Sequence, residues 1–181
     1  MNELEKQDNT GMTLSERLRS KREEKVLLCD YSGSMGWDCE PGYKRIEALR
    51  DTLKEIPNKT RIYAFNTSTR PVKDANDIPN PQGGTRMAQA FEYLKREGVK
   101  SIILLSDGAA NDPTQALAAA AGLSIQIMYI GPGEKPDFLD KLAALSGGFA
   151  TKEDLTKPKL LADKVTKLLG PAAQGAGAII L

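Results

Sequence analysis

The sequence contains no histidine, and this absence excludes several kinds of functional site. A Ser-His-Asp triad, a Cys-His thiol pair and a zinc site with histidine ligands all need an imidazole. There are only two cysteines, Cys29 in an apolar run and Cys39 in a polar segment. Neither a four-cysteine zinc site nor a disulfide framework is therefore expected.

An excess of charge of one sign is also missing. The chain has 25 Lys and Arg against 24 Asp and Glu, a formal net charge of +1. Proteins dedicated to nucleic acid or anionic membranes normally show a strong basic excess. No run approaches the roughly 20 apolar residues of a membrane-spanning helix. The first residues lack the apolar core of a signal peptide, so a cytoplasmic protein is expected.

The length of 181 residues fits one main domain. Residues 1–23 are predicted to be a polar segment with a short helix, started by the Thr13-x-x-Glu16 capping-box pattern. Residues 24–169 are predicted to form the domain. Residues 170–181 are a Gly/Ala linker with an apolar C-terminal tail, which either frays or docks on a surface.

Strand and helix patterns alternate along the domain. Apolar runs predict strands at 25–29, 61–65, 101–105, 125–130 and 149–151, with a weaker edge strand near 70–73. Between them, apolar residues at helical spacing and Pro or Gly at the ends predict helices over about 46–56, 87–97, 113–122, 138–145 and 158–169. This order predicts an α/β fold of the Rossmann-like, doubly wound type, with a mostly parallel sheet of about six strands and one antiparallel edge strand.

Polar side chains capable of binding a metal follow the predicted strands. Asp30, Ser32 and Ser34 come after the first strand, Thr85 opens a helix, and Asp107 follows the 101–105 strand. Parallel sheets place their sites at the carboxyl ends of the strands, so these five residues are expected to meet on one rim. Two carboxylates and three hydroxyls form an all-oxygen set, which suits a hard divalent cation.

Magnesium is the predicted cofactor, with Mn²⁺ or Ca²⁺ as alternatives in vitro. Only two carboxylates offset the charge of the ion, which leaves it able to take an anionic oxygen from a partner. Each segment alone also fits a plain structural role. Residues 30–34 resemble a self-capped turn, Thr85 a helix N-cap, and Asp107-Gly108 a strand-end turn. The metal hypothesis depends on all three segments occurring together.

The motifs DYSGSM (30–35), GGT (83–85) and LLSDG (104–108) resemble the metal-ion-dependent adhesion site of the von Willebrand factor A (VWA) domain family. The resemblance covers residues 24–169 and matches the family at all five site positions. It implies a Rossmann-like sheet with one metal on its rim, bound directly by the serines and the threonine and by the aspartates directly or through water. It also implies that the metal binds an acidic side chain of a partner protein. The chain resembles cytosolic single-domain prokaryotic-type members, which often work beside AAA+ ATPases or in multi-protein assemblies.

Two aromatic residues near the first motif have two interpretations. Trp37 and Tyr31 either pack under the loop or contact the partner beside the metal, and we predict partner contact for both. The function predicted is therefore a metal-dependent protein-binding module that recognises an Asp or Glu side chain or another carboxylate. No role in binding nucleic acid or membranes is predicted.

Two alternatives remain open at this point. The first is a magnesium-dependent phosphotransferase similar to haloacid-dehalogenase-like proteins, in which an aspartate ends a strand. Here Ser32 stands where the second carboxylate would act as general acid, and no phosphate-binding glycine motif is present, so no enzymatic activity is predicted. The second alternative is a structural subunit of a larger assembly, in which the metal only braces the loops.

Overall fold

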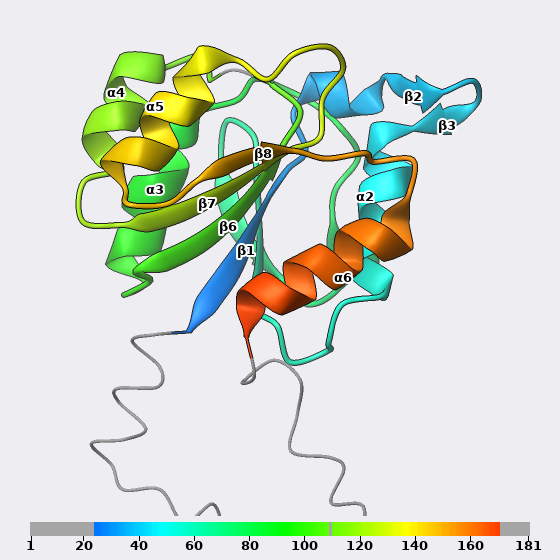
Figure 1. Cartoon of the computed structure of the whole chain (residues 1–181), viewed down its shortest axis with the longest axis horizontal. Coiled ribbons are helices and arrows are strands. Elements are labelled where there is room, and N and C mark those ends of the chain that lie inside the picture. Colours follow the sequence, from blue (N-terminus) through cyan, green and yellow to red (C-terminus); the bar gives the residue numbers. More distant parts are fainter. Residues whose placement is uncertain (1–23, 109, 171–181) are drawn as a thin grey trace, which may run out of the picture.

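The computed structural model describes residues 24–108 and 110–170. Within these ranges a six-stranded sheet is flanked by five α-helices (Figure 1). The strands are β1 (Lys25–Asp30), β4 (Ile62–Phe65), β5 (Thr69–Val72), β6 (Ser101–Ser106), β7 (Ser124–Tyr129) and β8 (Ala150–Lys152). The helices are α2 (Arg45–Lys54), α3 (Met87–Arg96), α4 (Pro113–Ala119), α5 (Asp137–Leu145) and α6 (Pro158–Leu169).

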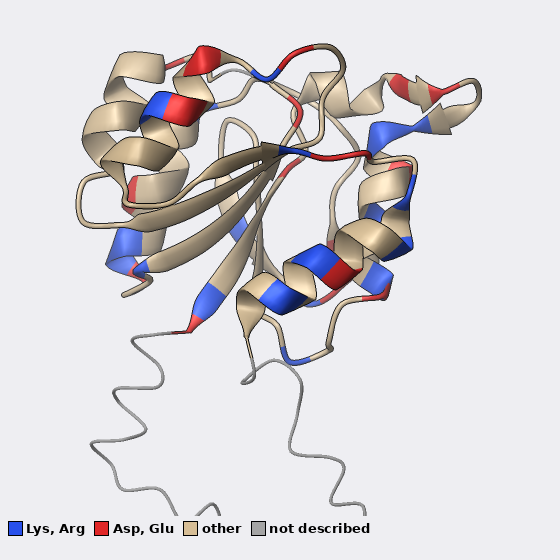
Figure 2. Cartoon of the chain, viewed as in Figure 1, with Lys and Arg blue, Asp and Glu red and all other residues tan. Residues whose placement is uncertain are grey.

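The sheet has the strand order β5-β4-β1-β6-β7-β8. All neighbouring strands are parallel except β5, which pairs antiparallel with β4. The predicted α/β class, the parallel sheet and the antiparallel edge strand are confirmed. The central strands carry almost no charged residues in Figure 2, because helices cover both of their faces.

Two apolar layers hold the sheet between its helices. Val26 and Leu28 of β1 pack with α3, α4 and α5 on one face. Leu27 and Cys29 point to the other face and pack with α2 and α6. Cys29 is fully buried, and burial raises the pKa of its thiol well above the usual range. It is a core residue, as its position in an apolar run indicates.

The sequence pattern missed one element near the first motif. A two-stranded sheet formed by β2 (Asp38–Glu40) and β3 (Tyr43–Lys44) lies between the first loop and α2. Its strands are too short to show a period of two, and Gly42 supplies the left-handed backbone of the turn, with φ at 77°. The predicted N-terminal helix and the C-terminal tail lie outside the described residues, so the domain boundaries stay a prediction.

Candidate metal centre

The predicted site residues converge at the carboxyl end of the sheet. Asp30 is the last residue of β1, and Asp107 follows the neighbouring strand β6. The loop before α3 reaches the same place, because the amide of Gly33 donates to the carbonyl of Gly83 at 2.9 Å. A Cβ atom at Gly33 would lie 3.3 Å from that carbonyl oxygen, so glycine permits the close approach of the two loops.

Asp30 forms the floor of the site and is completely buried. Its Oδ1 accepts a 2.7 Å hydrogen bond from the amide of Ser32, and its Oδ2 accepts one of 2.7 Å from the hydroxyl of Ser106. Burial nevertheless raises the pKa of Asp30 to about 6, while these hydrogen bonds act in the opposite direction. In the absence of a cation, the ionised carboxylate is therefore poorly stabilised.

The two serines stand beside each other above Asp30. They belong to a single 3-10 turn, η1 (Gly33–Gly36), with Ser32 as its N-cap. Their hydroxyl oxygens lie 3.2 Å apart, and the Ser34 hydroxyl donates to Oδ1 of Asp107 at 2.8 Å. The turn therefore brings both hydroxyls and the second carboxylate together.

Thr85 is held by a residue that sequence reasoning missed. The side chain of Asn111 accepts a 2.6 Å hydrogen bond from the Thr85 amide, and the Asn111 amide donates to the Thr85 carbonyl at 2.9 Å. The interpretation of Thr85 as the N-cap is wrong, since α3 begins at Met87 with Arg86 as its N-cap. The first amides of α3 donate to the carboxylate of Asp112 instead, at 3.1 Å.

Arg45, the first residue of α2, is the second functional residue that sequence reasoning missed. Its Nη1 lies 2.6 Å from Oδ2 of Asp107, and the side chains are 7% and 0% exposed. No local pattern in the sequence indicates this pair, because Asp107 lies 62 residues further along the chain.

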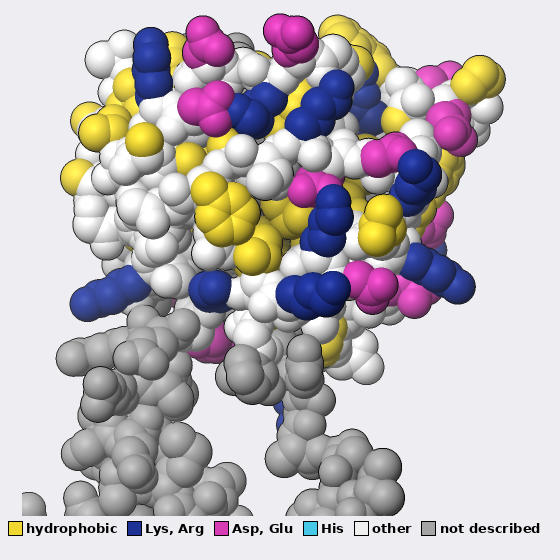
Figure 3. Space-filling model, in the orientation of Figure 1, with side chains coloured by type: hydrophobic (Ala, Val, Ile, Leu, Met, Phe, Trp, Pro, Cys, Tyr) yellow, Lys and Arg dark blue, Asp and Glu magenta, His cyan; other side chains and the backbone are white. Residues whose placement is uncertain are grey.

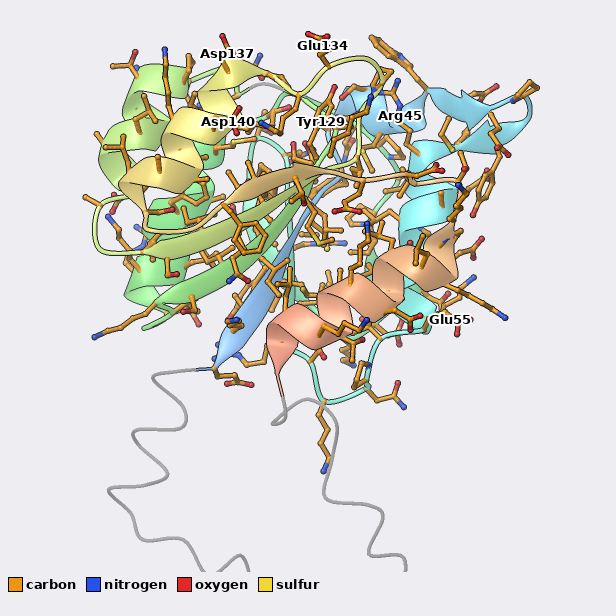
Figure 4. All side chains as sticks on the ribbon, in the orientation of Figure 1. Arg45, Glu55, Tyr129, Glu134, Asp137 and Asp140 are labelled. Atoms are coloured by element: carbon orange, nitrogen blue, oxygen red, sulfur yellow. The ribbon has the colours of Figure 1, made fainter. Side chains whose placement is uncertain are left out.

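These residues line an open cavity of about 440 Å³. Four of the five predicted residues border it, and Asp30 lies buried behind them. Tyr129, the last residue of β7, and Arg45, the first residue of α2, both line the cavity and lie at the same edge of the molecule in Figure 4. Among the residues that line this cavity in the described part of the chain, Arg45 and Asp107 are the charged ones. The lining residues are Ser32, Gly33, Ser34, Trp37, Arg45, Gly83, Gly84, Thr85, Asp107, Gly108, Asn111, Tyr129, Pro132 and Pro136.

The two aromatic residues of the first loop differ in exposure. Trp37 is 65% exposed and borders the cavity, so it is available to a partner. Tyr31 is only 3% exposed and packs in the core on the α2 side of the sheet. The prediction that Tyr31 contacts a partner is wrong for this structure, because the side chain that follows Asp30 turns into the core.

The donor set fits a divalent cation with octahedral coordination. Two adjacent oxygens at roughly 2.1 Å from Mg²⁺ lie about 3 Å apart, and the hydroxyl oxygens of Ser32 and Ser34 are separated by 3.2 Å. The Ser34 hydroxyl donates a hydrogen bond to Asp107, so its oxygen lone pairs can face an ion. In the described ranges no group of three or more His, Cys, Asp and Glu residues could hold a metal, so a site here depends on hydroxyl ligands.

Comparison with a family of known sequences decides the classification. The sequence model of the family described as "VWA domain containing CoxE-like protein" matches residues 6–123, a range that includes all five site residues. The chain belongs to this family. A search of curated proteins found no significant match.

Solved structures of other proteins agree with the fold. A von Willebrand factor type A protein from Catenulispora acidiphila superposes with a TM-score of 0.63 at 18% identity, over 81% of this chain and 42% of that one. Manganese-loaded TRAP protein from Plasmodium vivax gives 0.53 at 19% identity, over 80% and 74%. Proximal thread matrix protein 1 from the mussel byssus, with a zinc-occupied MIDAS (metal-ion-dependent adhesion site) motif, gives 0.52 at 19% identity, over 80% and 44%. The VWA chain therefore spans less than half the length of the first and third of these proteins.

Over residues 24–108 and 110–170, no helix is both long and apolar enough to cross a bilayer.

Proposed function

We propose that this VWA domain is a metal-dependent protein-interaction module. A divalent cation, Mg²⁺ in the cell, binds at a complete MIDAS formed by Asp30, Ser32, Ser34, Thr85 and Asp107. The cation takes an Asp or Glu side chain, or a terminal carboxylate, from a partner protein. The observation that carries the proposal is that Ser32, Ser34, Thr85 and Asp107 line one open cavity, with Asp30 buried behind it. The metal-loaded relatives support it.

Each residue has a defined part in this proposal. Ser32, Ser34 and Thr85 would hold the cation, and it would supply a Lewis-acidic centre for a carboxylate. Asp30 supplies negative charge below it, and Asp107 orients the Ser34 hydroxyl through the 2.8 Å hydrogen bond. Asn111 keeps Thr85 at the rim. Trp37 adds an exposed aromatic surface beside the carboxylate.

The alternative in which the metal only braces the loops has less support. The three loops are already joined by direct hydrogen bonds, from Gly33 to Gly83 and between Thr85 and Asn111 in both directions. A metal with only a structural role would add little stability to loops that these hydrogen bonds already hold together. We also propose no phosphotransferase activity, since Ser32 cannot act as a general acid in place of a carboxylate.

The test is a titration with an acidic peptide, in which the fluorescence of Trp37, the sole tryptophan, reports binding. Metal-loaded protein should give a saturable signal with a Glu-containing peptide and none with the matching Gln peptide. The signal should disappear in chelator and in the Ser34→Ala/Thr85→Ala variant. Peptide binding that survives both treatments would show that the metal is not the docking point.

The wider setting of the protein stays a prediction. A cytoplasmic, single-domain protein that works beside an AAA+ ATPase or in a multi-protein assembly is what the resemblance to cytosolic relatives implies. Capture of partners from the native cell, with and without chelator, would identify them.

A further inference from the structure

Arg45 is a buried cation built into the proposed metal site. Its Nη1 pairs with Asp107 at 2.6 Å and also donates to the carbonyl of Ser34 at 3.3 Å. Its guanidinium lies over the ring of Trp37, 5.4 Å from the centroid. The backbone amide of Arg45 donates to the carbonyl of Trp37 at 3.0 Å. The side chain is therefore fixed at the rim by both the first loop and the strand end.

Because of these contacts, the guanidinium of Arg45 cannot easily move out of the site when a metal cation binds. Arginine stays protonated at any physiological pH, and its planar face is well suited to the aromatic ring. Withdrawal of Arg45 would leave Asp107 as a buried carboxylate that has lost its cation partner, which is unfavourable. The positive charge of Arg45 is thus a permanent part of the site.

The charge balance of the site follows directly. Asp30, Asp107 and Arg45 together carry −1 when both carboxylates are ionised, whereas the two carboxylates alone would carry −2. A divalent cation changes the total to +1 in the presence of Arg45, and to zero without it. The loaded site therefore keeps a net positive charge that a partner carboxylate can neutralise.

We propose that Arg45 makes metal binding and carboxylate binding depend on each other. Arg45 weakens the binding of the metal cation in the absence of a partner. It also strengthens the attraction of the metal-loaded site for an anion. By linkage, a carboxylate that binds the loaded site tightens the metal by the same factor. This inference rests on the proposed function and adds to it that Arg45 sets the coupling, although it is not itself a metal ligand.

The experiment is a calorimetric titration of Mg²⁺ and Mn²⁺ into the wild type, Arg45→Gln and Arg45→Lys, each with and without acetate as a simple carboxylate. Without acetate, Arg45→Gln should bind metal about tenfold more tightly, since a unit charge close to a divalent ion is removed. In the wild type, acetate should tighten metal binding about fivefold, the lower end of common coupling factors. In Arg45→Gln this tightening should be much smaller.

Arg45→Lys keeps the charge and should retain both the weaker metal binding and the response to acetate. Arg50→Gln is the matched control, because Arg50 lies on the same helix and donates to Ile78 and Asn80 away from the cavity. It changes the net charge equally and should bind metal like the wild type. This comparison separates a local charge effect from a general one.

Several outcomes would overturn the inference. One is metal binding in Arg45→Gln that is no tighter than in the wild type, and another is an equal rise in Arg45→Lys. The absence of an acetate effect on wild-type metal affinity would also overturn it, and this measurement remains available if Arg45→Gln does not fold. A wild type that binds no divalent cation would instead contradict the proposed function.

Discussion

The Asp30 side and the Asp107 side of the site lie on neighbouring parallel strands, but their surroundings differ. Asp30 is buried among neutral donors, the amide of Ser32 and the hydroxyl of Ser106. Asp107 is also buried, but it is paired with the guanidinium of Arg45. Sheet topology therefore places two carboxylates side by side, and the groups that contact each carboxylate decide how much negative charge it offers to an ion.

The largest expected effect concerns the stability of the metal-free protein against pH. Burial raises the pKa of Asp30 from 3.8 to about 6. Because the pKa is raised on folding, the contribution of Asp30 to the free energy of unfolding is fully present below pH 3.8 and is lost as the pH rises through 6. Above that pH the folded state must hold an unfavourable charge. Asp30→Asn should therefore stabilise the chelated protein by about 3 kcal/mol at pH 8, and by little below pH 4.

Denaturant unfolding in chelator across this pH range measures the difference. Saturating Mg²⁺ at pH 8 should remove most of this difference, since the cation stabilises the ionised wild type more than the variant. A pH-independent difference between the two proteins would mean that Asp30 does not titrate between its unfolded and folded pKa values.

The second prediction compares the two carboxylates as partners of the metal. Asp30→Asn should weaken Mg²⁺ binding about 100-fold, the upper range for supporting groups of metal sites. The double variant Arg45→Gln/Asp107→Asn keeps the net charge of the site and should lose only about tenfold, through the lost orientation of Ser34. Calorimetry on both proteins decides, and equal losses would show that the Asp107–Arg45 pair contributes as much as Asp30.

A smaller effect is expected at the third loop. Asn111→Ala removes the acceptor of the Thr85 amide and leaves Thr85 held only by the backbone hydrogen bond from residue 111 to its carbonyl. Metal affinity should fall about tenfold, as is common when a residue that orients a ligand is removed. Asp112→Ala is the control, because it removes the cap of α3 and should lower stability by about 1 kcal/mol with less effect on the metal. Greater metal loss in Asp112→Ala would reverse this assignment.

The smallest effect distinguishes the two aromatic residues of the first loop. Trp37→Leu should weaken the binding of a Glu-containing peptide about threefold, in line with an exposed contact that contributes less than 1 kcal/mol. Tyr31→Phe removes only a hydroxyl that lies 3.5 Å from the Ser68 hydroxyl and should leave the peptide affinity unchanged. Peptide affinity is measured by calorimetry, so that the result does not depend on the tryptophan fluorescence.

Much of this arrangement could be predicted from the sequence because it follows from strand ends. Asp30 comes directly after an apolar run and Asp107 follows one with only Ser106 between them, and parallel strands bring such residues to one edge. Arg45 could not be placed, since its partner Asp107 is 62 residues away and no local pattern connects them. The role of Asp112 was hidden in the same way, because it caps a helix that begins 25 residues earlier.

The hydrogen bonds of Asn111 and Asp112 also affect how the protein folds. Both connect the segment after β6 to the start of α3, across 24 to 26 residues of chain. Contacts that close long loops form late when the ordered segments between them must assemble first. The metal ligands would then come together only after the transition state. Bound Mg²⁺ should slow unfolding and leave the refolding rate unchanged, which stopped-flow measurements in denaturant with and without the ion would show.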